Sequence, residues 1–108
     1  MRKPVAKKST PRIPKKVMIL GRQFTVKVVA EIHADGKVAS GSCSWVNKEI
    51  EIEKGLPINE QLGILAHEMA HATLDINGLA ETLTPKEVEI ICQTCRSVVE
   101  DFIKAFKK

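Results

Sequence analysis

The 108-residue chain has no tyrosine, one tryptophan and three phenylalanines, so aromatic side chains make up only 4% of it. No phenol is therefore available to stabilise an anion anywhere in the chain. No apolar run approaches the roughly 18–20 residues that a membrane helix needs, so we expect no spanning segment and no membrane partner. Three cysteines, an odd number, do not suit a disulfide framework, which favours a reducing, cytoplasmic setting.

The first 16 residues lack acidic side chains but contain seven lysines and arginines. Residues 17–108 carry ten basic and thirteen acidic residues, a net charge of −3. We therefore expect residues 1–16 to form an extended basic arm and residues 17–108 to form one small folded domain. Such an arm can contact nucleic acid or an acidic partner weakly. Because interleaved aromatics for base stacking are missing, a solubilising tail is the preferred interpretation.

Two segments alternate between apolar and polar side chains, residues 24–32 and residues 49–53, which is typical of half-buried strands. A short apolar run over residues 17–20 predicts a further strand. Residues 38–46 are small and polar, and we expect them to be irregular or to form an edge strand. Asp35-Gly36 is a turn signal. Together these segments predict a small antiparallel sheet of about three to four strands.

Two helices are expected after the strands. Between Pro57 and Gly78, apolar residues recur at spacings of three and four and also cover much of the opposite side, which predicts a helix buried between the sheet and the last helix. Thr84-Pro85-Lys86-Glu87 matches a capping box that begins this last helix, whose apolar stripe runs from Val88 to Phe106. The predicted fold class is α+β.

The buried helix contains the segment His67-Glu68-Met69-Ala70-His71. His67 and His71 lie about 40° apart around the helix and one turn along it, so both imidazoles can face one ion. Glu68 projects about 100° from His67, beside the open position of such an ion. Polar side chains are costly to bury in an apolar helix without a partner, so a metal site explains these residues better than a chance occurrence of the pattern. The HExxH pattern predicts a site where two neutral histidines bind Zn²⁺ and the glutamate takes a proton from water.

A third ligand is needed, and two positions on the same helix are poor candidates. A histidine six residues after His71 would continue one known pattern, but that residue is Asn77. Asp75 is on nearly the same face as His67 but lies roughly 12 Å away along the axis. One ion cannot easily bind both ends of that span, so Asp75 is at best an outer partner of the site.

The remaining carboxylates of suitable reach are Glu81, Glu87 and Glu89. Glu87 is the acidic member of the predicted capping box, so the backbone of Thr84 competes for its carboxylate. Glu89 is free, but Glu87 lies closer to the centre of the apolar stripe. Spacing alone therefore favours Glu87 and Glu89 nearly equally as the third ligand.

The segment LGILAHEMAHA at residues 62–72, together with residues 87–92, resembles the short gluzincin-type metallopeptidase domains, above all the ImmA/IrrE-type domains and their small phage-encoded relatives. The resemblance spans roughly residues 17–108, and only the HExxH segment is highly specific. It implies that the third ligand is a glutamate opening an Exx(small) pattern early in the next helix. Glu89-Ile90-Ile91-Cys92 fits that pattern, so the resemblance favours Glu89 over Glu87.

These observations predict a zinc-dependent peptidase that acts on peptides or proteins. His67, His71 and Glu89 would bind one Zn²⁺, and Glu68 would be the general base. The alternative is a catalytically weak or inactive binding module in which residues 1–16 contact nucleic acid or a protein partner. Loss of binding without loss of zinc, after removal of that arm, would favour the module.

Four further residues each have two interpretations. Peptidases of this broad class often stabilise the oxyanion with a tyrosine or histidine, and His33 is the only histidine outside the HExxH segment. A surface position for His33 is the simpler expectation. Cys92 and Cys95 form a CxxC pattern but lie on the apolar stripe, so core packing is expected before redox or metal chemistry. Trp45 is expected to anchor the core rather than to contact substrate.

Overall fold

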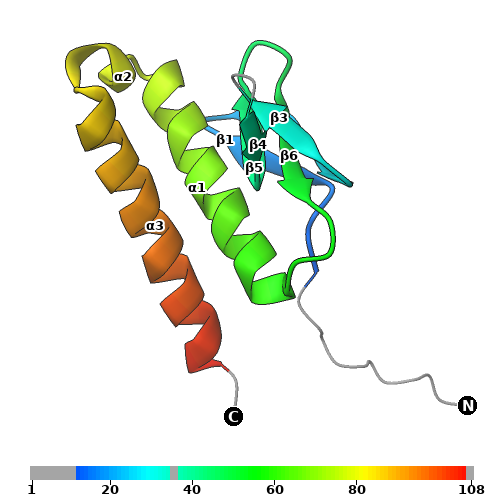
Figure 1. Ribbon diagram of the computed structural model, residues 1–108. Coiled ribbons are helices and arrows are strands. Elements are labelled where there is room, and N and C mark those ends of the chain that lie inside the picture. Colours follow the sequence, from blue (N-terminus) through cyan, green and yellow to red (C-terminus); the bar gives the residue numbers. More distant parts are fainter. Residues whose placement is uncertain (1–11, 35–36, 107–108) are drawn as a thin grey trace, which may run out of the picture.

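The structure is a computed structural model that describes residues 12–34 and 37–106. Its order of elements confirms the predicted α+β class, with short strands first and helices last (Figure 1). The elements are β1 (Lys16–Ile19), β2 (Arg22–Val29), β3 (Ile32–Ala34), β4 (Lys37–Ala39), β5 (Gly41–Ser44), β6 (Glu49–Glu53), α1 (Ile58–Ile76), α2 (Leu79–Thr82) and α3 (Pro85–Ala105).

The main sheet has four strands in the order β1-β2-β6-β5. β1 pairs with β2 and β5 pairs with β6 in antiparallel fashion, but β2 and β6 are parallel. The predicted antiparallel sheet is therefore wrong in its central pair. β5 and β6 pair with each other and run in opposite directions. Whichever of them lies next to β2 therefore decides whether the central pair is parallel or antiparallel. Here β6 docks beside β2, and β5 is left at the edge.

Residues 24–32 form two strands instead of the single strand that was predicted. β2 ends at Val29, and β3 begins at Ile32 as part of a separate two-stranded sheet with β4. The predicted edge strand within residues 38–46 corresponds to β5. The chain therefore leaves the main sheet after β2 and returns to its far edge.

The core lies between one face of the main sheet and α1. Phe24, Val26, Ile50 and Ile52 point from alternate positions of β2 and β6, and α1 contributes residues including Ile64. On its other side α1 packs against α3, so α1 is the middle layer, as predicted (Figure 1). A helix in this position can present side chains both to the sheet edge and to the neighbouring helix.

The predicted capping box at the start of α3 is confirmed. The Thr84 hydroxyl accepts a hydrogen bond from the Glu87 N–H at 3.1 Å, and the Glu87 carboxylate accepts one from the Thr84 N–H at 2.9 Å. The apolar stripe of α3 is only partly covered, however, because Phe102 and Phe106 are 63% and 71% exposed. Only the side of α3 that faces α1 is buried in the part of the chain that the structure describes.

Two predictions fall wholly or mainly on residues that the structure does not describe. Residues 1–11, most of the predicted basic arm, and the predicted Asp35-Gly36 turn lie outside the described residues. Lys16, the last residue assigned to the arm, is the first residue of β1. Among the described helices, none has the length and apolar character needed to cross a membrane.

Candidate metal centre and active site

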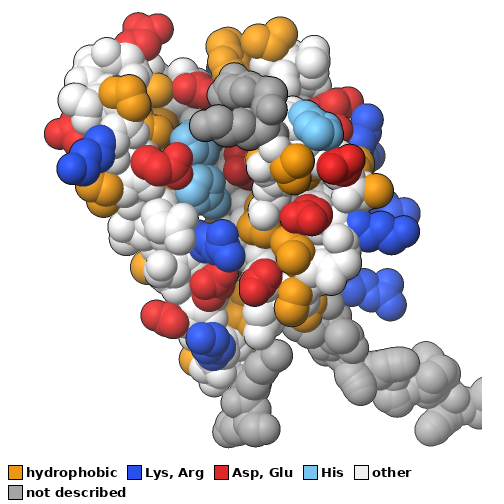
Figure 2. All heavy atoms as spheres, in the orientation of Figure 1, with side chains coloured by type: hydrophobic (Ala, Val, Ile, Leu, Met, Phe, Trp, Pro, Cys, Tyr) orange, Lys and Arg blue, Asp and Glu red, His pale blue; other side chains and the backbone are white. Residues whose placement is uncertain are grey.

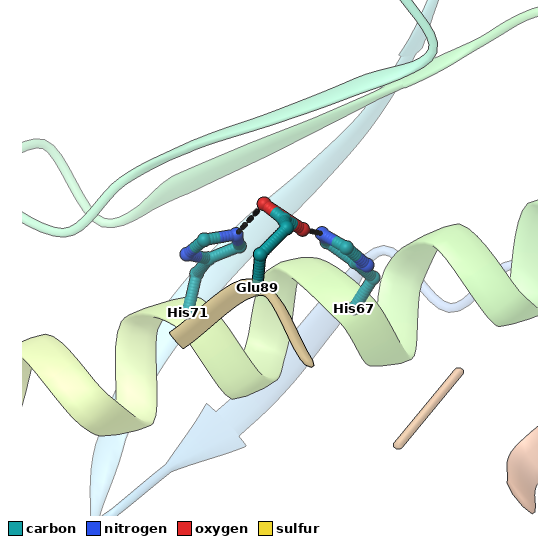
Figure 3. A group of neighbouring side chains, drawn as sticks. All are labelled: His67, His71 and Glu89. Atoms are coloured by element: carbon teal, nitrogen blue, oxygen red, sulfur yellow. Dashed lines mark ion pairs between the residues drawn. The ribbon is translucent and has the colours of Figure 1, made fainter. Parts of the chain in front are cut away.

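His67 and His71 lie on consecutive turns of α1 with their ring centroids 5.0 Å apart. The Nε2 atom of His67 is 2.8 Å from one carboxylate oxygen of Glu89, and the Nε2 atom of His71 is 3.5 Å from the other. Figure 3 shows the Glu89 carboxylate between the two imidazoles. Each of the three residues offers one ligand atom, and these atoms all lie within 4.8 Å of one another. The structure therefore brings the three predicted ligands together.

Glu89 reaches the histidines from α3, whereas Glu87 is engaged elsewhere. The Glu87 carboxylate is held by the backbone of Thr84 in the capping box. The cap fixes where α3 begins, and Glu89 follows in the first turns, beside the middle of α1. Of the two glutamates that spacing left nearly even, the structure places Glu89 at the histidines. Metal binding by this group stays a prediction.

A cleft lies in front of these residues, with a volume of about 580 Å³. It is bordered by the edge strand β5, by α1 and by the start of α3, and Figure 2 shows histidine side chains in a hollow on this face with acidic side chains around them. Its lining residues are Gly41, Ser42, Cys43, His67, Glu68, His71, Asp75 and Glu89. The volume is within the range of small-ligand sites in proteins.

Glu68 lies in the cleft beside both histidines but forms no ion pair among the described residues. Burial raises the pKa of its carboxyl to about 6, with Glu89 adding to the rise and His71 opposing it. Burial disfavours the charged form of a carboxyl, which makes the carboxylate a stronger base. A base whose pKa lies near neutrality can both take up and release a proton at physiological pH.

The environment of His67 keeps its imidazole neutral. Burial lowers the pKa of His67, and the nearby Glu89 carboxylate partly offsets that effect. Neutral imidazole is the form that binds a metal ion. The Nδ1 atom of His67 is buried and has no hydrogen-bond partner among the described residues. Nε2, which faces Glu89, is therefore the nitrogen that His67 can offer to a ligand.

The sequence analysis missed the contribution of β5 to the cleft. A Cβ atom on Gly41 would lie 2.5 Å from Ile64 Cγ2 and 3.1 Å from a Glu68 carboxylate oxygen, so only glycine allows this approach of strand and helix. Cys43 also lines the cleft, and burial raises the pKa of its thiol to about 12, with Glu68 adding to the rise. In the absence of a bound ion, Cys43 is therefore a protonated thiol. Gly41 and Cys43 belong to no recognised motif, and residues 38–46 were expected only to be irregular or to form an edge strand.

Other singled-out residues lie away from the chemistry. His33 is on β3, its side chain is 60% exposed with Nε2 3.6 Å from Glu31, and it is not among the described residues that line the cleft. Trp45 is 44% exposed, so the expectation of a core anchor is wrong. It lies in the turn that follows the edge strand β5. Cys92 is fully buried, as expected for core packing, and burial raises the pKa of its thiol to about 12.

Comparison with known families adds one finding to this geometry. The model of the DA1-like family, described as Protein DA1, matches residues 16–100. The chain belongs to the DA1-like family. The matched range includes every residue that lines the cleft of this DA1-like chain. No curated protein and no solved structure is significantly similar to the chain, and the resemblance to ImmA/IrrE-type domains finds no support in these comparisons.

Proposed function

We propose that this DA1-like chain is a zinc-dependent peptidase of the gluzincin type. His67, His71 and Glu89 bind one Zn²⁺, and Glu68 is the general base. The proposal is carried by the convergence of three ligand atoms within 4.8 Å in the cleft that also contains Glu68. Two imidazoles and one carboxylate are a known donor set of catalytic zinc sites, which keep a further position open for water.

An ion-free network is the competing explanation for the same contacts. The Glu89 carboxylate alone accounts for both histidine contacts, as an ion pair with whichever imidazole is protonated, and no metal is required. That network gives no role to Glu68, which is half-buried next to the histidines and unpaired within the described part of the chain. A half-buried carboxylate without a charged partner is costly, and a catalytic role explains why it is kept there.

The proposed reaction is hydrolysis of a peptide bond. Zinc bound at these ligands supplies Lewis-acid polarisation of water and of the substrate carbonyl. The Glu68 carboxylate accepts a proton from the water as its oxygen bonds to the carbonyl carbon. Glu68 then gives the proton to the leaving nitrogen as the carbon–nitrogen bond breaks. The pKa of about 6 suits Glu68 to both steps near neutral pH.

The substrate is an extended segment of a peptide or protein. β5 is the edge strand of the main sheet and lines the cleft through Gly41, Ser42 and Cys43. An extended chain can add to such an edge through backbone hydrogen bonds. Such strand addition positions a scissile bond in front of Glu68 with little dependence on the substrate sequence.

The test is hydrolysis of a denatured protein by zinc-loaded wild-type chain and by Glu68→Gln. We expect Glu68→Gln to retain one zinc ion per chain and to lose at least about a hundredfold in rate, because the general base is gone. Zinc content is measured on the same samples. Equal rates of hydrolysis by the two proteins at equal zinc content would contradict the proposal.

A further inference from the structure

The cleft continues past His67 into a second hollow, the Arg96 pocket. This pocket is lined by Ser40, Gly41, Ile64, His67, Glu68 and Arg96. Gly41, His67 and Glu68 line both hollows, so the two are continuous at the proposed catalytic residues. Arg96 lies on α3 two turns after Glu89, on the same side of that helix. A substrate held in front of Glu68 therefore extends towards Arg96.

Charge changes sign along this groove. Glu68, Asp75 and Glu89 give the cleft three carboxylates, whereas Arg96 is the only cation that lines either hollow in the described part of the chain. Asp75 follows His71 by one turn of α1 and therefore lies at the end of the cleft away from His67. Figure 2 shows a basic side chain bordering the hollow near the histidines. Apart from the proposed zinc site, the Arg96 end is thus the one place in the groove where an anionic group meets a positive charge.

The position of Arg96 is maintained by two other residues. Its Nε donates a hydrogen bond to the Glu100 carboxylate at 2.9 Å, and both side chains are 27% exposed. Glu100 lies directly against Gly63 of α1, where a Cβ atom would be 2.8 Å from Glu100 Cγ and 2.9 Å from Cδ. Glycine inside a helix is destabilising relative to alanine, and α1 by itself gives no reason for it. The space at Gly63 admits Glu100, and Glu100 orients Arg96.

The terminal NH₂ groups of Arg96 are free to bind a ligand. Nε is the guanidinium donor bonded to Glu100, and Arg96 forms no ion pair with Glu68 or Glu89 within the described residues. A guanidinium presents its donors in a planar fork that matches a carboxylate. We propose that Arg96 binds a carboxylate of the substrate at the His67 end of the cleft, so that the enzyme prefers peptides with an acidic group there. This inference rests on the proposed peptidase function.

Binding to the non-hydrolysing Glu68→Gln variant tests this proposal, with zinc loaded and fluorescence anisotropy as the readout. The probes are three pools of short, labelled peptides with random uncharged residues. One pool includes glutamate and has an amidated end, one includes glutamine and has a free C-terminal carboxylate, and one includes glutamine and an amidated end. We expect one acidic pool to bind about tenfold or more tightly than the neutral pool, as for one charge-assisted pair. Which acidic pool is preferred identifies the source of the carboxylate.

The variants in this background isolate Arg96. Arg96→Gln is expected to abolish the acidic preference, and Arg96→Lys to restore only part of it, because lysine keeps the charge without the fork. Lys86→Gln is the control, since it removes the same charge from an exposed position of α3. Gly63→Ala is expected to retain zinc but lose the preference, because the new methyl group displaces Glu100. Alanine strengthens α1, so this loss cannot come from a weakened helix.

The outcomes separate this inference from the proposed function. Equal binding of all three pools, no binding, or a preference that survives Arg96→Gln would overturn the carboxylate site. Wild-type hydrolysis of the same pools is measured alongside. If all pools bind equally and the wild type cleaves them, the peptidase stands and the Arg96 inference fails. If the preference depends on Arg96 but the wild type cleaves none, the binding site stands and the peptidase proposal fails.

Discussion

Glu68 and Glu89 are two carboxylates at the same pair of histidines, and their environments differ. The Glu89 side chain is 58% exposed and contacts both imidazoles, whereas Glu68 is half-buried and its pKa is raised to about 6. The position of Glu89 between the imidazoles makes it available as a ligand, while partial burial makes Glu68 the stronger base. Position and burial therefore assign ligand and base to the two glutamates in the proposed mechanism.

Gly41 is the residue whose substitution should disturb Glu68 without touching the ligands. A methyl group at this position would contact Ile64 and the Glu68 carboxylate, so we expect Gly41→Ala to displace Glu68. The expected result is unchanged zinc content and a rate lowered on the order of tenfold to a hundredfold, as for other small misplacements of a catalytic group. Peptide hydrolysis and zinc content are measured together. Ser42→Ala, the neighbouring change on β5, is the control, and equal rates for both variants would contradict this role of Gly41.

At the scale of elements, the signals that were predicted correctly are local. The capping box at Thr84, the position of α1 and the convergence of His67 and His71 all depend on residues within one or two helical turns. The parallel pairing of β2 with β6 and the break at Val29 were not predicted, because they depend on how distant segments dock. Gly41 and Arg96 escaped notice for the same reason, since only the folded chain brings them to His67 and Glu68 of α1.

The start of α3 is expected to contribute measurably to stability, because it fixes both the helix and the approach of Glu89. Thr84→Ala removes the side-chain cap and should lower the free energy of unfolding by about 1 kcal/mol. Thr94→Ala is the matched control on the same helix, since the Thr94 hydroxyl only hydrogen-bonds the Ile90 carbonyl. That change should be neutral or slightly stabilising. Urea unfolding measures both, and equal midpoints would contradict the importance of the cap.

At the scale of the whole molecule, the described part of the chain is three layers: the main sheet, α1 and α3 (Figure 1). Because α1 is the shared middle layer, its two sides serve different purposes. One side packs on the sheet with residues such as Ile64, and the other meets α3. The cleft forms along the border between those sides, where β5, α1 and the start of α3 come together.

This layering predicts a sharp contrast between two phenylalanines. Phe24 is fully buried between the sheet and α1, whereas Phe102 is 63% exposed on the outer side of α3. Phe24→Ala should lower the free energy of unfolding by about 3–5 kcal/mol, and Phe102→Ala by less than about 0.5 kcal/mol. Thermal or urea unfolding of the two variants checks this. A large loss for Phe102→Ala would show that the outer side of α3 is covered in solution.

The most direct test of the account is zinc content after dialysis, measured for the wild type and for single alanine variants of His67, His71, Glu89 and Glu87. The account predicts one zinc ion per wild-type chain, loss of zinc in the first three variants and full retention in Glu87→Ala, whose carboxylate only caps α3. A wild-type chain that takes up no zinc, or a Glu89→Ala variant that keeps it while Glu87→Ala does not, would contradict the central claim.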